Sequence, residues 1–369
     1  MYVAALPISA SGWEGQHYQR IGKWRICGLS TPVEPLGGDD VDLLLSPDND
    51  DVMVFHKGLR IEDVQVVSYR TDFSARMQGI LDCDVLAEKR VLMIGAGSVG
   101  SKLAMHLARA GVGRFAIIDF DTVEAANLCR CEYFVDDIGR RKTLALQDKL
   151  LNVNPRAEVE TRQQNVKEIK DKELLELIRR SDLVVSAADD PVAEQRLNAL
   201  AHSSVPVVYP ALYSRASGGE VIFTVPGGPC YQCVVGTLRS VSGVPSRGEW
   251  DYTTAGDLKA EPGLGIDIDH VVVIASKIAL ALLMDDVEGS GIARMIDRGR
   301  TVVFVANQRQ EIYGLPFEPF ETVWAETEIN RNCAVCQVRK EDDDNLLSAV
   351  RARVAKAAAV DFPETEKKE

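Results

Sequence analysis

Long hydrophobic runs are missing from this sequence. The longest, residues 271–284, contains Lys277 and is shorter than the roughly 20 apolar residues that span a bilayer. Residues 1–15 also lack the basic start and the apolar stretch of a secretory signal. We therefore expect a cytoplasmic chain without a membrane segment, in which residues 271–284 belong to a buried helix.

An excess of positive charge is also missing. Lysine and arginine total 42 against 55 aspartate and glutamate residues, which gives a net charge of −13. Such a surface repels nucleic acids and anionic membranes, so neither is expected as the main partner. With 369 residues, 46% of them hydrophobic, the chain can still bury one large core and a smaller module.

Both ends of the chain have little regular hydrophobic pattern. Residues 1–84 are polar and rich in turn signals, and their short hydrophobic runs predict a small, mostly β accessory segment. We expect this segment to bind a partner or a peptide. Residues 340–369 are a charged tail with one weak helical pattern at 346–360. The main domain is therefore expected at residues 85–339.

Within the main domain, short hydrophobic runs alternate with helical patterns. The predicted strands are 91–94, 115–119, 158–162, 182–187, 205–212, 216–225 and 301–306. The predicted helices are 99–110, 143–151, 172–180, 191–202 and 266–284. This alternation is typical of an α/β fold with a doubly wound, mostly parallel sheet.

A glycine-rich turn joins the first strand to the first helix of this series. Gly95, Gly97 and Gly100 lie in the run GAGSVG, where missing Cβ atoms let backbone N–H groups approach a nucleotide phosphate. Asp119 ends the next strand, where a carboxylate can accept hydrogen bonds from a ribose. NAD and ATP both carry that ribose, so these features predict nucleotide binding only. A P-loop is excluded because Ser101 precedes Lys102.

The next segment favours ATP. Residues 119–130 read DFDTVEAANLCR, and residues 137–142 read DIGRRK. Here the sequence resembles the ThiF/MoeB superfamily, which includes the ubiquitin-activating (E1-like) enzymes, at every defining position of D-x-D-x-V-x-x-x-N-L-x-R and D-I-G-x-x-K. The resemblance covers about residues 81–336. It implies a Rossmann-like domain that uses ATP and Mg²⁺ to adenylate a carboxylate.

The resemblance also implies roles for single residues. Adenylation builds negative charge on the α-phosphate and on the departing pyrophosphate, so cations must lie there. Arg130 and Lys142 would be these cations. Asn127 would orient the phosphates, and Asp119 would hold the ribose. Two lone basic residues would ordinarily be surface charges, but their combination with Asn127 and the glycine turn favours function.

A second acidic position follows the strand at 182–187. The family carries a Mg²⁺-binding aspartate after such a strand, which corresponds to Asp189 in this chain. Asp190 stands where relatives usually have asparagine. An aspartate here can instead cap the helix that begins near Pro191.

Four of the eight cysteines form two C-x₂-C pairs, Cys230 with Cys233 and Cys333 with Cys336. Four thiolates suit tetrahedral Zn²⁺ without an open position, so we expect a structural zinc site. Two unrelated redox pairs are the alternative. A redox pair would usually precede a helix in a thioredoxin-like unit, and no such unit is predicted.

The chain departs from the family in two respects. Many relatives carry a nucleophilic cysteine after the second zinc-pair cysteine, but residues 234–302 contain none. Cys129 and Cys131 flank Arg130 and are the remaining candidates, with Cys131 expected either to fill space or to be activated by the charge. Relatives also donate an arginine across a dimer interface, for which Arg76 is the first candidate and Arg70 the second.

The leading hypothesis is adenylation of the C-terminus of a small ubiquitin-like or sulfur-carrier protein with a Gly-Gly tail, by a homodimer. A conjugating enzyme or a sulfurtransferase would then be a further partner. A short peptide, as in microcin-type biosynthesis, is the alternative substrate. A zinc-containing NAD(P)-dependent oxidoreductase and a non-catalytic subunit are the remaining alternatives.

Overall fold

The computed structural model describes residues 73–242 and 261–336, except 286, 288–289 and 297–298, together with the backbones of seven strands within residues 2–68. The helix expected at 346–360 and the second candidate arginine, Arg70, lie outside these residues. The chain divides into two compact units, residues 1–79 and 80–369. Each unit is described by itself.

The first unit is built from strands, as expected for the N-terminal segment. A parallel pair joins β1 (Tyr2–Ala5) to β7 (Gln65–Ser68). Five strands form a second sheet in the order β2-β3-β4-β5-β6, in which only β3 and β4 run parallel. Their bounds are β2 (Arg20–Ile21), β3 (Trp24–Cys27), β4 (Val41–Leu45), β5 (Val52–His56) and β6 (Leu59–Ile61).

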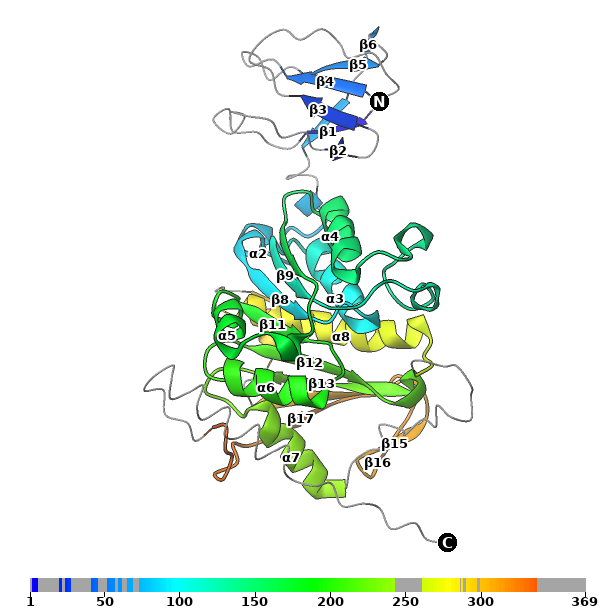
Figure 1. Ribbon diagram of the computed structural model, residues 1–369. Helices are drawn as coiled ribbons and strands as arrows, with labels where there is room; N and C mark the ends of the chain where they lie inside the picture. The colour runs from blue at the N-terminus through cyan, green and yellow to red at the C-terminus, as the bar shows by residue number, and fades with distance from the viewer. Residues whose placement is uncertain are drawn as a thin grey trace. The chain divides into compact units, whose positions relative to one another are not determined.

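The second unit contains an eight-stranded sheet in the order β10-β9-β8-β11-β12-β13-β14-β17 (Figure 1). The first five strands of this order are parallel, and the last three are antiparallel. Their bounds are β8 (Arg90–Ile94), β9 (Arg114–Ile118), β10 (Glu158–Arg162), β11 (Leu183–Ser186), β12 (Val207–Leu212), β13 (Gly218–Thr224), β14 (Arg300–Ala306) and β17 (Thr322–Glu326). The expected doubly wound, mostly parallel sheet is confirmed.

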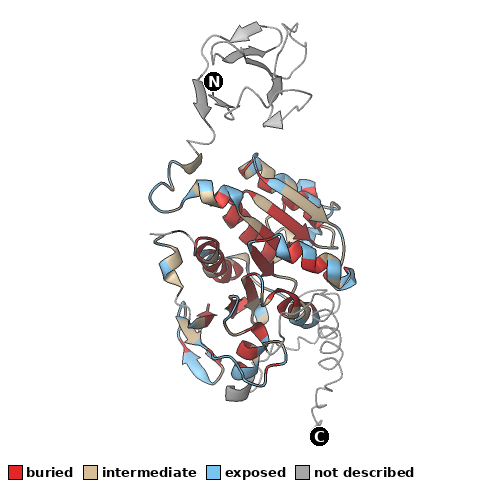
Figure 2. Ribbon diagram, turned by 90° about the vertical axis from the view of Figure 1, so that its left-hand side faces the viewer, coloured by how far each residue is buried: buried red, intermediate tan, exposed pale blue. Residues whose placement is uncertain are grey.

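Helices cover both faces of this sheet because successive strand residues point to opposite sides. Leu183 and Val185 of β11 belong to one core cluster, and Val184 belongs to the other. The first cluster is completed by α3 (Ser98–Arg109), α4 (Lys142–Val153) and α8 (Gly265–Leu283). The second is completed by α5 (Asp171–Arg179), α6 (Pro191–Ala201) and α7 (Tyr231–Ser242). Figure 2 shows the buried residues concentrated in the sheet and on the helix faces that cover it.

Every strand and helix expected in the main domain is present within a few residues of its predicted bounds. The segment of residues 271–284 lies in α8, which is buried on the face toward the sheet. Among the described residues, no helix is long and apolar enough to cross a bilayer. Five helices and strands were not predicted, namely α2 (Cys83–Glu88), α7, the edge strand β17, and the hairpin of β15 (Gln310–Ile312) and β16 (Leu315–Phe317).

The order in which strands are added to the sheet reverses between β8 and β11. From β8 the chain proceeds outward through β9 and β10, and it then returns to the other side of β8 as β11. In open parallel sheets, ligands bind at the carboxyl ends of the strands beside such a reversal. The residues that follow Ile94 and Ser186 should therefore face a ligand site.

Candidate active site and metal centre

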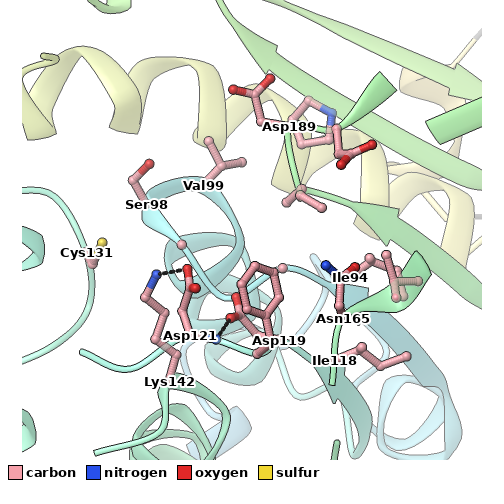
Figure 3. Close-up of a pocket in the computed structure, with 18 of the residues that line it drawn as sticks. Ile94, Ser98, Val99, Ile118, Asp119, Asp121, Cys131, Lys142, Asn165 and Asp189 are labelled. Carbon is pink, nitrogen blue, oxygen red and sulfur yellow. Dashed lines mark hydrogen bonds and ion pairs between the residues drawn. The ribbon is translucent and has the colours of Figure 1, made fainter. Parts of the chain in front are cut away.

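A cavity of about 380 Å³ lies at this carboxyl edge of the sheet (Figure 3). Its walls come from residues that follow β8, β9, β10 and β11, and from the end of β12. Eight of the residues that sequence reasoning proposed line it: Gly95, Gly97, Asp119, Asn127, Arg130, Cys131, Lys142 and Asp189. Residues as far apart in the chain as the glycine turn and Asp189 therefore meet at one place.

The three glycines of the turn have different functions. Gly95 has φ +94°, and a Cβ there would lie 2.5 Å from the carbonyl oxygen of Ala187. A Cβ on Gly100 would lie 2.1 Å from the carbonyl oxygen of Gly95. A Cβ on Gly97 would meet no atom within 4 Å. Gly95 and Gly100 are thus required by protein packing, whereas Gly97 leaves open space at the N-terminus of α3, where anions are favoured.

Two side chains hold the glycine turn in place. The two carboxylate oxygens of Asp119 accept hydrogen bonds from the N–H groups of Ala96 and Asp121, each at 2.7 Å. The hydroxyl of buried Tyr133 donates to the carbonyl oxygen of Ala96 at 2.6 Å, and burial raises the pKa of that hydroxyl well above its usual range. Each carboxylate oxygen has a second lone pair, so Asp119 can still accept a ribose hydroxyl. Tyr133 was not identified from the sequence.

Lys142, at the start of α4, faces the cavity. Its side chain is 10% exposed, and its ammonium group lies 2.7 Å from a carboxylate oxygen of Asp121, which is half exposed (Figure 3). Sequence reasoning proposed Lys142 but overlooked Asp121, although the D-x-D pattern contains it. A cation held by a single exposed carboxylate can exchange that partner for a phosphate.

Arg130 and Asn127 lie on the connection between β9 and α4. The guanidinium of Arg130 donates to the backbone oxygen of Glu261 at 2.6 Å. The side-chain oxygen of Asn127 accepts the N–H of Glu124 at 2.9 Å, which closes the short helix η1 (Ala125–Asn127). Glu261 also accepts hydrogen bonds from Ser214 and Arg215 through its carboxylate. This connection is thereby tied to the turn after β12.

The two aspartates after β11 have separate functions. Asp190 caps α6, because its Oδ1 accepts the N–H groups of Val192 and Ala193 at 3.0 Å each. Burial raises the pKa of Asp190, but hydrogen bonds from Lys167 and from these N–H groups outweigh it and lower the pKa below its usual value. Asp189 has φ +48° and lines the cavity opposite Lys142 (Figure 3). The capping alternative therefore applies to Asp190, and Asp189 is placed where a carboxylate could hold Mg²⁺.

Of the two expectations for Cys131, its burial favours the space-filling one over activation by its basic neighbours. Cys131 lines the cavity, but burial raises the pKa of its thiol to about 11 even though Lys142 and Arg130 act in the opposite direction. At neutral pH the thiol stays protonated, so it is a poor nucleophile. Cys129 is exposed, and its thiol contacts the backbone oxygen of Ala126 at 3.4 Å.

Two proposed residues are not among those that line the cavity. Gly100 supports the turn from inside α3. Arg76 is exposed and belongs to the first unit, so its role across a dimer interface stays a prediction.

The four expected zinc ligands converge. The sulfur atoms of Cys230, Cys233, Cys333 and Cys336 lie within 4.8 Å of one another. The Cys230–Cys233 distance is 3.8 Å, and each of these cysteines lies 3.5 Å from one cysteine of the second pair. A tetrahedron with Zn–S bonds of about 2.3 Å has edges of roughly 3.8 Å, so this set fits zinc. The N–H of Asn330 also points at the sulfur of Cys233, at 3.4 Å.

The alternative of two separate redox pairs does not fit this arrangement. The first pair does lie at the start of a helix, α7, which the sequence did not predict. The second pair, however, closes directly over the first, and Cys230 and Cys233 are buried. Four sulfurs around one point are suited to hold a single metal ion rather than to form two exchangeable disulfides.

Comparison with known proteins gives four findings. Residues 69–281 match the model of the ThiF family. The chain is 31% identical over 208 residues to a SAMP-activating enzyme E1 of Haloferax volcanii, covering 55% of this chain and 70% of that protein. It is 32% identical over 177 residues to a molybdopterin-synthase adenylyltransferase of Escherichia coli, covering 47% of this chain and 70% of that protein. Among solved structures, E. coli MccB with ATP matches with a TM-score of 0.51 and 17% identity, covering 69% of this chain and 68% of that chain.

Proposed function

The chain belongs to the ThiF family, and we propose that it uses ATP to adenylate the C-terminal carboxylate of a small ubiquitin-like or sulfur-carrier protein. It is an E1-like adenylyltransferase. The observation that carries the proposal is the convergence of Lys142, Arg130 and Asp189 on the cavity that the glycine turn opens. A hydride-transfer enzyme would need the turn and the ribose carboxylate but has no use for this charge arrangement.

The reaction needs no redox step. A carboxylate oxygen attacks the α-phosphorus of ATP, the bond from that phosphorus to the bridging oxygen breaks, and pyrophosphate leaves with the electron pair. The products are an acyl-adenylate and pyrophosphate. Arg130 and Lys142 are placed to offset the negative charge that develops on these oxygens. The space at Gly97 admits the phosphates to the N-terminus of α3.

Two metals belong to this proposal. Asp189 would hold Mg²⁺, which offsets phosphate charge when it is bound. The four cysteines would hold a structural Zn²⁺, because a complete tetrathiolate shell leaves no position for substrate. With the thiol of Cys131 protonated, we propose that the acyl-adenylate is passed directly to an external nucleophile.

The proposed substrate is a flexible tail of the Gly-Gly type, because a chain without side chains can reach the α-phosphate in a narrow site. A conjugating enzyme or a sulfurtransferase would receive the activated group. We further propose a homodimer in which Arg76 reaches the partner's site. Residues 1–68 lie outside the family match, and the first unit, residues 1–79, is compact by itself, which keeps a short peptide as a second candidate substrate.

Isotope exchange between ATP and labelled pyrophosphate tests the function. We expect exchange that depends on Mg²⁺ and on added carrier protein, and that is lost when the carrier lacks its terminal glycine. Exchange stimulated by a short peptide but not by any carrier protein would favour the second candidate. A purified protein that binds no ATP by calorimetry would overturn adenylation as such and favour a non-catalytic subunit.

A further inference from the structure

A buried polar network joins the cysteine site to helix α6. Tyr231 lies between Cys230 and Cys233 in sequence, and its hydroxyl donates to a carboxylate oxygen of Glu194 at 2.6 Å. The backbone N–H of Tyr231 donates to the side-chain oxygen of Asn198 at 3.0 Å. Both residues of α6 thus contact Tyr231, which lies between the two cysteines of the first pair.

These groups are buried within an otherwise apolar core. Glu194 is 3% exposed and Asn198 is 1% exposed. Burial of such groups is costly unless hydrogen bonds satisfy them, and their geometry is then strongly fixed. An apolar pair would fill the same space, so packing alone does not require a glutamate and an asparagine here.

Helix α6 leads directly to the cavity. Its cap is Asp190, and the residue before the cap is Asp189, whose left-handed backbone conformation aims it at the nucleotide site. Glu194 and Asn198 follow the cap by four and eight residues, so they lie one and two turns along the same side of the helix. A shift of α6 along or about its axis would therefore move Asp189.

We propose that Tyr231, Glu194 and Asn198 are positioning residues that couple the cysteine site to the cation site at Asp189. The ordered cysteine site fixes Tyr231, Tyr231 fixes α6, and α6 fixes Asp189. This inference rests on the proposed function, because it takes Asp189 as the residue that holds the divalent cation.

The structure offers a matched control beside Tyr231. The ring of Tyr209 lies 4.4 Å from the ring of Tyr231, and Tyr209 is fully buried on β12. Its hydroxyl has no hydrogen-bond partner among the described residues. Tyr231→Phe and Tyr209→Phe therefore remove the same atom from the same aromatic pair, but only the first breaks the link to Glu194.

The test measures zinc content and divalent-cation binding in the full-length protein. Mn²⁺ replaces Mg²⁺ and is titrated by water-proton relaxation in the presence of a non-hydrolysable ATP analogue. The Mg²⁺ dependence of pyrophosphate exchange is measured in parallel. For Tyr231→Phe we expect one zinc per chain, as in the wild type, and Mn²⁺ binding and Mg²⁺ activation weakened threefold to tenfold, with Tyr209→Phe unchanged in both. Glu194→Gln keeps an acceptor for the hydroxyl and should stay within twofold of the wild type.

Each outcome separates the inference from the proposed function. Equal Mn²⁺ binding by the wild type and Tyr231→Phe, or an equal loss in Tyr209→Phe, overturns the coupling and leaves adenylation intact. A wild type that binds Mn²⁺ but shows no exchange overturns adenylation and leaves the coupling intact. A wild type that binds no Mn²⁺ with the analogue overturns both.

Discussion

The cysteine site and the nucleotide cavity differ in how their polar groups are arranged. In the cysteine site the groups surround one point, whereas in the cavity they pair with one another or with the backbone. The four sulfurs lie close enough to surround one ion, and three of the four cysteines are buried. In the cavity, the charged groups bind one another or the backbone instead. Lys142 pairs with Asp121, and Arg130 donates to the oxygen of Glu261. We call the cysteine site the closed site, because four sulfurs would enclose a bound ion. We call the nucleotide cavity the open site, because its charged side chains pair with groups that a substrate can replace.

The difference follows from how the two sites are assembled. Each cysteine pair is local in sequence, so its two sulfurs are placed by a single turn, and two contacts between the pairs complete the site. The cavity draws its residues from the ends of five strands. Such a site keeps the freedom to bind and release that turnover requires. The predictions below test this contrast, from the largest expected effect to the smallest.

Lys142→Ala should impair the open site most. The variant lacks an ammonium group that would offset the negative charge developing on the phosphate oxygens. We therefore expect pyrophosphate exchange to be slower by about 10²- to 10³-fold. Zinc content should not change. Lys149→Ala is the matched control, because Lys149 lies on the same helix and pairs with Asp137 at 2.5 Å but does not line the cavity. Equal losses in the two variants would show that the effect is structural.

Loss of zinc from the cysteine site should lower the stability of the folded protein. A metal present at about 100 to 1,000 times its Kd stabilises the folded state by roughly 2.7–4.1 kcal/mol. For a domain of this size, that corresponds to a fall in Tm of about 5–16 °C for Cys333→Ser, measured by calorimetry with zinc quantified in parallel. Cys83→Ser changes a thiol outside the four-cysteine site and should keep both zinc and Tm. A Tm unchanged in Cys333→Ser would argue against a structural metal.

Glycine substitutions should separate ligand space from protein packing. Gly97→Ala places its methyl group in open space, so we expect ATP binding to weaken about tenfold, or roughly 1.4 kcal/mol, at an unchanged Tm. Gly100→Ala collides with the carbonyl oxygen of Gly95 and should lower Tm instead. Calorimetric ATP titration and thermal unfolding of both variants would distinguish these cases. If Gly97→Ala also lowers Tm, the space is not reserved for a ligand.

Cys131→Ser should have the smallest effect. With a thiol pKa of about 11, only about one part in a thousand is thiolate at pH 8, and this fraction rises about tenfold per pH unit up to the pKa. Exchange by Cys131→Ser should therefore stay within about threefold of the wild type. Alkylation of Cys131 by iodoacetamide, followed by mass spectrometry, should be slow at pH 8 and accelerate toward pH 11. Rapid alkylation at pH 7 would contradict this environment.

Most of the main domain was predictable from the sequence because four of the five parallel strands, all except β10, are short hydrophobic runs. The missed elements carry weaker patterns. β15 and β16 are three residues each, and α7 begins within the C-x₂-C pair, where the metal pattern concealed the helical one. Short edge strands have too few buried positions to show a period.

The candidate site was predictable only in part. The match of one segment to the family's motif identified Asn127, Arg130 and Lys142 as a group. The supporting contacts were not visible, because Tyr133 bonds to Ala96 across 37 residues and Arg130 bonds to Glu261 across 131 residues. Such pairs depend on tertiary structure, which no local pattern encodes. Asp121 is the exception, since it stands in the recognised pattern and only its partner was unknown.

The two cysteine pairs of the closed site are synthesised at different times during translation. The sulfurs of Cys233 and Cys336 lie 3.5 Å apart although 103 residues separate them in sequence, so the first pair leaves the ribosome long before the second is made. At translation rates of about 5–20 residues per second, the first pair waits roughly 5–20 s for its partners. During that interval a nascent chain presents two nearby thiols to oxidants and competing metals. A metal bound after the second pair emerges would end that exposure by enclosing all four sulfurs.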